Sequence, residues 1–232
     1  MKDQRYMLDF ETTIDIDSRK MIIPSLDGEY VKNREEFFDI PGHANKVFEE
    51  NKEFDYLIPR YSDEYIEVEF LCDFHSWIGE KPSFFSGIPI SKRMKEIVEK
   101  FNLYPNKFYG AKVMFKGEYH EYYIWQFFLD GFNKFVDLEN STFCEWKRRK
   151  RIGDDIITVS NLDELLDYED DHEWWNWGFE RAVMKKEYKD IDAAKLAYPY
   201  GILISERLKN ALERAELTGF KITSFPMKFE YL

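Results

Sequence analysis

A helix that occurs twice is the sequence feature that most constrains this fold. Ser91 and Ser205, which differ by 114 positions, each stand as a typical N-cap between an apolar strand end and an amphipathic helix. The apolar residues then follow the same helical steps in both copies: Ile90, Met94, Ile97, Val98 and Phe101 in the first, and Ile204, Leu208, Ala211, Leu212 and Ala215 in the second. The pattern predicts one unit present twice, with two unrelated core helices as the alternative.

The rest of the chain predicts the α+β class, with a mainly antiparallel sheet and helices packed on it. The clearest signals are a hairpin over residues 108–129 that turns at Lys116-Gly117, and a half-buried strand over 65–75 with strict alternation. Other strands are expected at residues 5–10, 15–23, 132–138, 141–146, 155–160 and 179–184, and helices at 33–38, 44–54 and 188–196.

We expect a single α+β domain over residues 1–232, built from two related β-α-β halves. Residues 1–86 would form an N-terminal region, and 87–232 would hold the two helix–strand units. With 44% hydrophobic and 18% aromatic residues, the chain can bury a large core.

Composition also limits the classes of partner that the protein can bind. A net charge of −12 disfavours binding to nucleic acid or to an anionic membrane and favours a basic partner, although acidity for solubility alone is an alternative. No long apolar run or apolar signal core is present, so we expect a cytoplasmic protein without membrane contact. In that reducing compartment Cys72 and Cys144 should be separate buried thiols.

An acidic stretch rich in tryptophan is the candidate binding surface. Residues 161–180 contain no Lys or Arg, and large aromatic side chains beside unpaired carboxylates are typical of surfaces that bind a basic protein. The alternative is that the tryptophans belong to the core and the acids only solvate a loop. The candidate residues are Asp163, Glu164, Asp167, Glu169, Asp170, Asp171, Glu173, Trp174, Trp175 and Trp177.

The sequence contains no motif for catalysis, and we expect no cofactor and no metal. The four histidines are scattered, and no zinc, phosphate-loop or nucleophile-elbow pattern occurs. An alternating strand would put Cys72 and His75 on opposite faces, which argues against a thiolate pair. The basic run 147–151 could hold phosphates, but a solvated hairpin tip closing at Gly153 is the preferred interpretation. A small hydrolase or toxin-modifying enzyme with a carboxylate or histidine site remains the alternative function.

The order of these blocks resembles the immunity protein 11 family. Residues 204–220, read as Ile-Ser-x-Arg-Leu-Lys-x-Ala-Leu-Glu-x-Ala-x-Leu-Thr-Gly-Phe, are similar to its C-terminal signature, and Tyr122-Tyr123 and residues 135–141 resemble its middle blocks. The resemblance covers about residues 87–225, except for 147–177. It implies a bacterial immunity protein that binds and neutralises a cognate secreted toxin by occlusion, without catalysis. The negative charge then favours a basic toxin, such as a nuclease.

Overall fold

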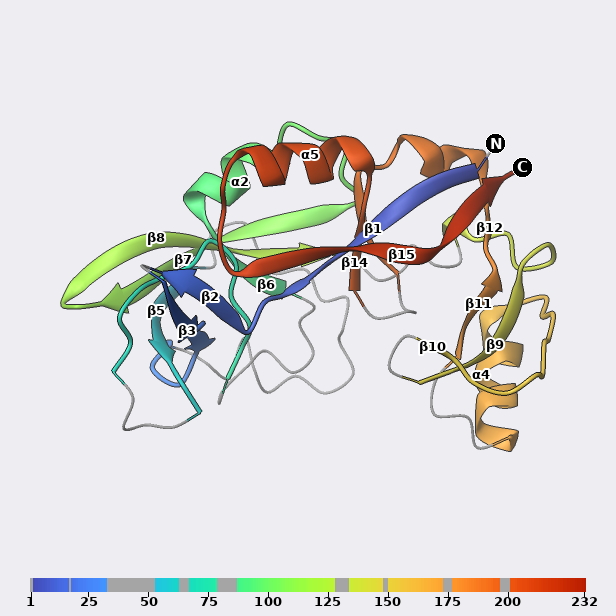
Figure 1. Ribbon diagram of the computed structural model, residues 1–232, viewed down its shortest axis with the longest axis horizontal. Coiled ribbons are helices and arrows are strands. Elements are labelled where there is room, and N and C mark those ends of the chain that lie inside the picture. Colours follow the sequence, from blue (N-terminus) through green and yellow to red (C-terminus); the bar gives the residue numbers. More distant parts are fainter. Residues whose placement is uncertain are drawn as a thin grey trace.

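The computed structural model describes residues 2–16, 18–32, 53–62, 67–78, 87–127, 134–147, 150–172, 177–196 and 201–232. Over these residues the protein is α+β, as the sequence predicts, with two five-stranded sheets along an elongated molecule (Figure 1). Helices α2 (Lys92–Val98) and α5 (Glu206–Arg214) contact one another and lie together along one side.

The sheet of the first unit has the order β4-β5-β7-β8-β6. Its strands are β4 (Ser25–Asp27), β5 (Glu53–Arg60), β6 (Gly87–Ser91), β7 (Asn106–Phe115) and β8 (Glu118–Phe127). The predicted hairpin is confirmed: β7 and β8 pair from Asn106↔Phe127 to Phe115↔Glu118. Lys116 and Gly117 both have positive φ, as a type I′ turn requires.

The sheet of the second unit has the order β12-β15-β1-β14-β13. Its strands are β1 (Lys2–Phe10), β12 (Val183–Met184), β13 (Ala193–Leu196), β14 (Gly201–Ile204) and β15 (Phe220–Tyr231). The N-terminal strand β1 lies between β14 and β15 and pairs antiparallel with both. Lys2 stands opposite Glu230, so the two chain ends lie side by side (Figure 1). Residues 2–10 are therefore part of the second unit rather than of a separate N-terminal region.

The two sheets share one plan. In the first sheet, β8 pairs antiparallel with β6, the strand before the helix, and with β7, the strand after it. In the second sheet, β1 pairs antiparallel in the same way with β14, before the helix, and with β15, after it. The next strand, β5 or β12, is parallel to the strand after the helix in both sheets. The pair β15–β1 thus corresponds to the hairpin β7–β8, with the chain ends in place of its turn.

Both repeated helices start at the predicted serine. The hydroxyl oxygen of Ser91 accepts the N–H of Met94 at 3.1 Å, and that of Ser205 accepts the N–H of Leu208 at 3.2 Å. The backbone of each serine is extended, as an N-cap requires. Leu208 and Leu212 of the second helix are fully buried, which agrees with the apolar stripe.

An aspartate behind each N-cap joins the two units: Asp73, which is partly buried, and Asp192, which is fully buried. Asp73 and Asp192 each accept a hydrogen bond from the N-cap hydroxyl of their own unit, both at 2.6 Å. Each carboxylate also accepts a backbone N–H from the loop after the other unit's helix: Thr218 to Asp73 at 3.0 Å, and Asn102 to Asp192 at 2.9 Å. The contacts are reciprocal, so the two units are related by an approximate two-fold arrangement.

One hydrophobic cluster lies between the two units and under both helices. Its members come from both sheets and both helices, and include Leu8, Ile90, Met94, Trp125, Ile204 and Leu208. Burial of this shared cluster, which the hydrophobic effect drives, makes the two units one packed body. A second cluster lies beneath the first sheet, around Phe54, Leu57 and Ile124.

The chain between the two units forms a separate layer on the second sheet. It contains β9 (Thr142–Lys147), β10 (Lys150–Arg151), α4 (Leu162–Asp171), β11 (Trp177–Arg181) and the 3₁₀ helix η1 (Lys186–Asp190). Its aromatic residues pack against Met7, Leu203 and Phe225 of the second sheet. Before the first unit, a small hairpin pairs β2 (Thr13–Ile16) with β3 (Arg19–Ile22).

The predicted strand over residues 65–75 is wrong in the part that the structure describes. Residues 67–73 form no strand, and Phe74 makes only an isolated bridge, to Ile90. The N–H groups of Asp73 and Phe74 both donate to the carbonyl of Thr218, at 3.1 Å each. This contact with the second unit holds the segment together with two backbone hydrogen bonds to β6, from the N–H of Ser91 to Asp73 at 2.8 Å and from the N–H of His75 to Pro89 at 3.0 Å.

Other predicted elements also differ. Residues 134–135 are helical and Val136 bridges Met184, so the strand expected at 132–138 is wrong over its described residues, 134–138. Residues 155–160 make one bridge, at Ile157, instead of a strand. The helix expected at 188–196 is replaced by η1 and β13, and residues 53–54 begin β5 instead of ending a helix. Residues 33–38 and 44–52 lie outside the described residues.

Candidate protein-binding surface

The acidic stretch of the sequence forms helix α4, and its outward face is the first candidate surface. Asp163, Leu166, Asp167 and Asp171 are exposed at helical spacing, whereas Leu165 on the opposite face is fully buried. We call these four exposed residues the acidic helix face. The composition of this stretch predicted a binding surface or a solvated loop, and not a helix.

Glu164 has a structural role at the start of this helix. The side-chain oxygen of Asn161 accepts the N–H of Glu164 at 2.9 Å, and the Glu164 carboxylate accepts the N–H of Ser160 at 2.8 Å and its hydroxyl at 2.6 Å. These hydrogen bonds lower the pKa of Glu164. The pattern Asn161-x-x-Glu164 is a variant of the capping box in which the carboxylate bonds Ser160, one residue before the cap, and it was the missed signal for α4.

Trp177 is a correction to the predicted surface. It begins β11, is 1% exposed, and packs edge to face on Phe143. Because β11 pairs with β9 over the second sheet, its inward positions belong to the core. Glu173, Trp174 and Trp175 lie outside the described residues, as do the side chains of Glu169 and Asp170.

Charge is distributed unevenly around α4. Residues 152–172 carry eight acidic side chains and no Lys or Arg. The same segment exposes Ile152, Ile156 and Leu166, which are among the most exposed large apolar residues of the described chain. Apolar side chains in a field of one sign are typical of a surface that attracts and then buries an oppositely charged partner.

The basic run 147–151 lies in the neighbouring hairpin. Lys147 stands opposite Lys150, so the chain reverses inside the run and before Gly153, the position that the sequence predicted for closure. Arg151 forms an exposed ion pair with Glu180 at 3.0 Å. This pairing agrees with a solvated hairpin.

Cys72 and His75 lie close together, contrary to the expectation of opposite faces. The backbone N–H of Cys72 donates to Nε2 of His75 at 3.1 Å, so Nδ1 carries the proton and donates to the carbonyl of Pro24 at 2.7 Å. Burial lowers the pKa of His75 to about 4 and raises the pKa of the Cys72 thiol to about 11. A neutral imidazole with both nitrogens bonded and a protonated thiol do not form an activated nucleophile pair.

The residues that the structure describes contain no group of His, Cys, Asp and Glu side chains placed to hold a metal ion. Within the same residues, no helix is long and apolar enough to cross a membrane.

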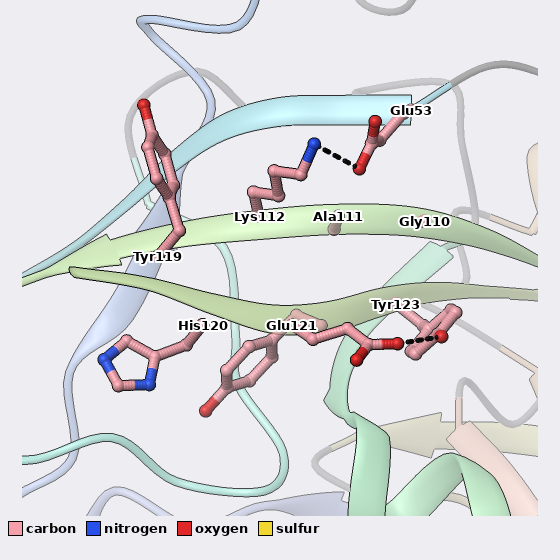
Figure 2. Close-up of a pocket in the computed structure, with 9 residues that line it drawn as sticks. Glu53, Gly110, Ala111, Lys112, Tyr119, His120, Glu121 and Tyr123 are labelled. Atoms are coloured by element: carbon pink, nitrogen blue, oxygen red, sulfur yellow. Dashed lines mark hydrogen bonds and ion pairs between the residues drawn. The ribbon is translucent and has the colours of Figure 1, made fainter.

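A groove on the first sheet is the second candidate surface (Figure 2). It has a volume of about 350 Å³ and lies across β5, β7 and β8. Lys112 points to Glu53 and pairs with it at 3.0 Å, and Tyr119 projects from β8 beside them (Figure 2). Gly110 forms part of the floor, where a side chain would meet Glu53. Sequence pattern does not reveal this groove, because its residues come from separate strands.

No family model matches this chain, and no curated protein matches it significantly.

Proposed function

We propose that this protein is a bacterial immunity protein that binds a basic cognate toxin and neutralises it by occlusion, without catalysis. The proposal combines the resemblance of residues 204–220 to the immunity protein 11 family with the charge of the segment around α4. The observation that carries it is the acidic helix face together with Ile152 and Ile156, exposed within 21 residues that hold eight acidic side chains and no Lys or Arg.

The physical argument is electrostatic attraction followed by apolar burial. A basic toxin would be drawn to residues 152–172 because their charges have one sign, and Leu166, which is 38% exposed, would lose water on contact. This segment lies between the two repeated units and belongs to neither of their shared elements. The fold common to both units therefore does not require its acidic residues.

Neutralisation is tested by co-expression with the toxin domain encoded next to this gene. Expression of the toxin alone should stop growth, and this protein should restore it and co-purify with the toxin. Growth arrest that persists despite abundant folded protein, with no complex in a pull-down, would refute the proposal.

The binding surface is tested by removing its charge. Asp163→Asn, Asp167→Asn and Asp171→Asn together should weaken toxin binding by more than about 2 kcal/mol, with most of the change in the association rate and a reduced salt dependence. The matched control is Glu96→Gln, Glu118→Gln and Glu206→Gln, which removes the same charge from exposed positions of the repeated units. Equal effects of the two triple variants would show that only net charge matters and would remove the acidic helix face from the interface.

A further inference from the structure

Comparison of the two units separates features that the shared fold uses from features that only one unit has. A lysine of the repeated helix lies over a tyrosine ring and pairs with the glutamate four residues later in both units. The residues are Lys95, Tyr123 and Glu99 in the first unit, and Lys209, Tyr6 and Glu213 in the second. Because both units contain this arrangement, it belongs to the common architecture.

A row of tyrosines on the first sheet has no such counterpart. Tyr30 contacts Tyr56 edge to face at 5.9 Å between ring centroids, and Tyr56 contacts Tyr119 in the same way at 5.9 Å. Tyr30 and Tyr119 are each 55% exposed, which is more than any other exposed aromatic side chain of the described residues. The matching end of β1 begins Lys-Asp-Gln-Arg, without an aromatic residue. We call the three rings, with Glu53 and Lys112, the tyrosine surface.

Positive and negative charges balance on and beside the tyrosine surface. Three exposed lysine–carboxylate pairs surround the rings: Lys112–Glu53 at 3.0 Å, Lys32–Asp55 at 3.2 Å and Lys92–Glu121 at 2.8 Å. Exposed pairs of this kind contribute little to stability, so their members can exchange partners at low cost. The local balance differs from the net charge of −12 of the chain and from the purely acidic segment around α4.

We propose that the tyrosine surface binds a second copy of this chain in a two-fold dimer. Two copies of a strongly acidic protein repel one another, and a region with balanced charge is where they can approach. Two-fold contacts require a self-complementary surface. A lysine–glutamate pair meets this condition, because Lys112 of each copy can pair with Glu53 of the other. The exposed rings of Tyr30 and Tyr119 would supply the buried aromatic area.

The position of the tyrosine surface agrees with a role separate from toxin binding. Helix α4 and the hairpin end of β7–β8, which carries Tyr119, lie at opposite ends of the long axis (Figure 1). A dimer formed at the tyrosine surface leaves both acidic helix faces free. The dimer proposal does not depend on the proposed function and can be tested without a toxin.

The first experiment measures mass by sedimentation equilibrium at several protein and salt concentrations. We expect a reversible dimer that becomes tighter as ionic strength rises, because salt screens the repulsion between the two acidic copies. Toxin binding should show the opposite salt dependence, since it joins opposite charges. A monomer at all concentrations up to about 1 mM, the weak end of measurable affinities, would overturn the proposal.

The second experiment exchanges the charges. Lys112→Glu and Glu53→Lys should each weaken dimerisation about tenfold or more, and the double variant should restore it, because the self-complementary pairs return with reversed polarity. Tyr119→Ala should weaken the dimer roughly 30-fold, as loss of an aromatic hot spot does. Arg181→Glu breaks the exposed pair Arg181–Glu230 on the second unit and should leave the dimer unchanged.

The effects of these variants on dimerisation and on toxin binding together show which partner binds at the tyrosine surface. A dimer that survives Lys112→Glu and Tyr119→Ala forms elsewhere and refutes this surface. A protein that stays monomeric but loses toxin binding on Tyr119→Ala uses the surface for its partner, which also overturns the proposal. Circular dichroism and thermal melts confirm that each variant is folded before either conclusion is drawn.

Discussion

Asp192 receives the hydroxyl of Ser205 at 2.6 Å from its own unit and the N–H of Asn102 at 2.9 Å from the other unit. Asp73 makes the same two kinds of contact with the units exchanged. A carboxylate that accepts bonds from both units makes helix initiation in one unit depend on the loop of the other. The two units should therefore unfold together.

Asp192→Ala should test this coupling. Asp192 is 1% exposed and also pairs with Arg207, so its removal leaves the Ser205 hydroxyl and the Asn102 N–H without their acceptor. We expect a loss of about 2–4 kcal/mol in the free energy of unfolding, measured by urea denaturation. Asp163→Ala on the exposed face of α4 is the control and should change it by less than about 0.5 kcal/mol. Two separate unfolding transitions would contradict the coupling.

A circular permutant should fold. The ends of β15 and β1 stand where the turn of the corresponding hairpin β7–β8 lies, with Lys2 opposite Glu230. Joining residue 232 to residue 1 by a short glycine-containing turn and opening the chain between Lys116 and Gly117 should preserve the far-ultraviolet circular dichroism and a cooperative melt. Opening the chain within β8 at Ile124, which is fully buried, should prevent folding. If both permutants are unfolded, the equivalence of the two hairpins is wrong.

Gly219→Ala should be strongly destabilising because the backbone comes close to Phe74. A Cβ at residue 219 would lie 2.0 Å from the Phe74 carbonyl oxygen, and the φ of Gly219 is +96°. We expect a loss of more than about 3 kcal/mol in the free energy of unfolding. Gly117→Ala is the matched control, since φ there is +83° but no atom lies within 4 Å of the added Cβ. That change should cost only about 1–2 kcal/mol. Similar costs at both positions would argue against the close contact.

Stability should fall as the pH drops below about 6.5 because of His75. Burial lowers the pKa of His75 to about 4, so the unfolded chain binds a proton that the folded chain excludes between pH 6.5 and pH 4. The contribution of neutral His75 to the free energy of unfolding is complete above pH 6.5. It falls by up to about 1.4 kcal/mol for each pH unit inside this window. Urea melts at pH 7 and pH 5 measure it.

His75→Gln should show a smaller difference between pH 7 and pH 5, whatever its stability at pH 7. An unchanged pH difference in His75→Gln would assign the effect to another group.

Local chemistry explains which elements could be predicted. The serine caps at Ser91 and Ser205 and the Lys116-Gly117 turn are each set by neighbouring residues, and all three are confirmed. The strand expected at 65–75 was wrong because alternation alone cannot reveal that Thr218, far along the chain, provides the hydrogen-bond acceptor. Trp177 was placed on the surface because sequence pattern does not show which face of β11 is covered.

The tyrosine surface could not be predicted for a similar reason. Tyr30, Tyr56 and Tyr119 come from three separate parts of the chain, and the pairing of β4 with β5, of β5 with β7 and of β7 with β8 brings them together. The composition of the sequence predicted an acidic surface at this segment. That the segment is a helix could have been predicted from Asn161, which caps the start of α4.

The central position of β1 has a consequence for synthesis on the ribosome. β1 is made first, but its two neighbours, β14 and β15, are made last, whereas β6, α2, β7 and β8 of the first unit follow one another directly. The strands of the first unit can therefore pair while the chain is still growing, but the cluster that it shares with the second unit stays open, and β1 stays unpaired, until β14 and β15 emerge. Closing such distant contacts is slow, so the emergence of β14 and β15 from the ribosome sets the earliest moment at which the native molecule can form.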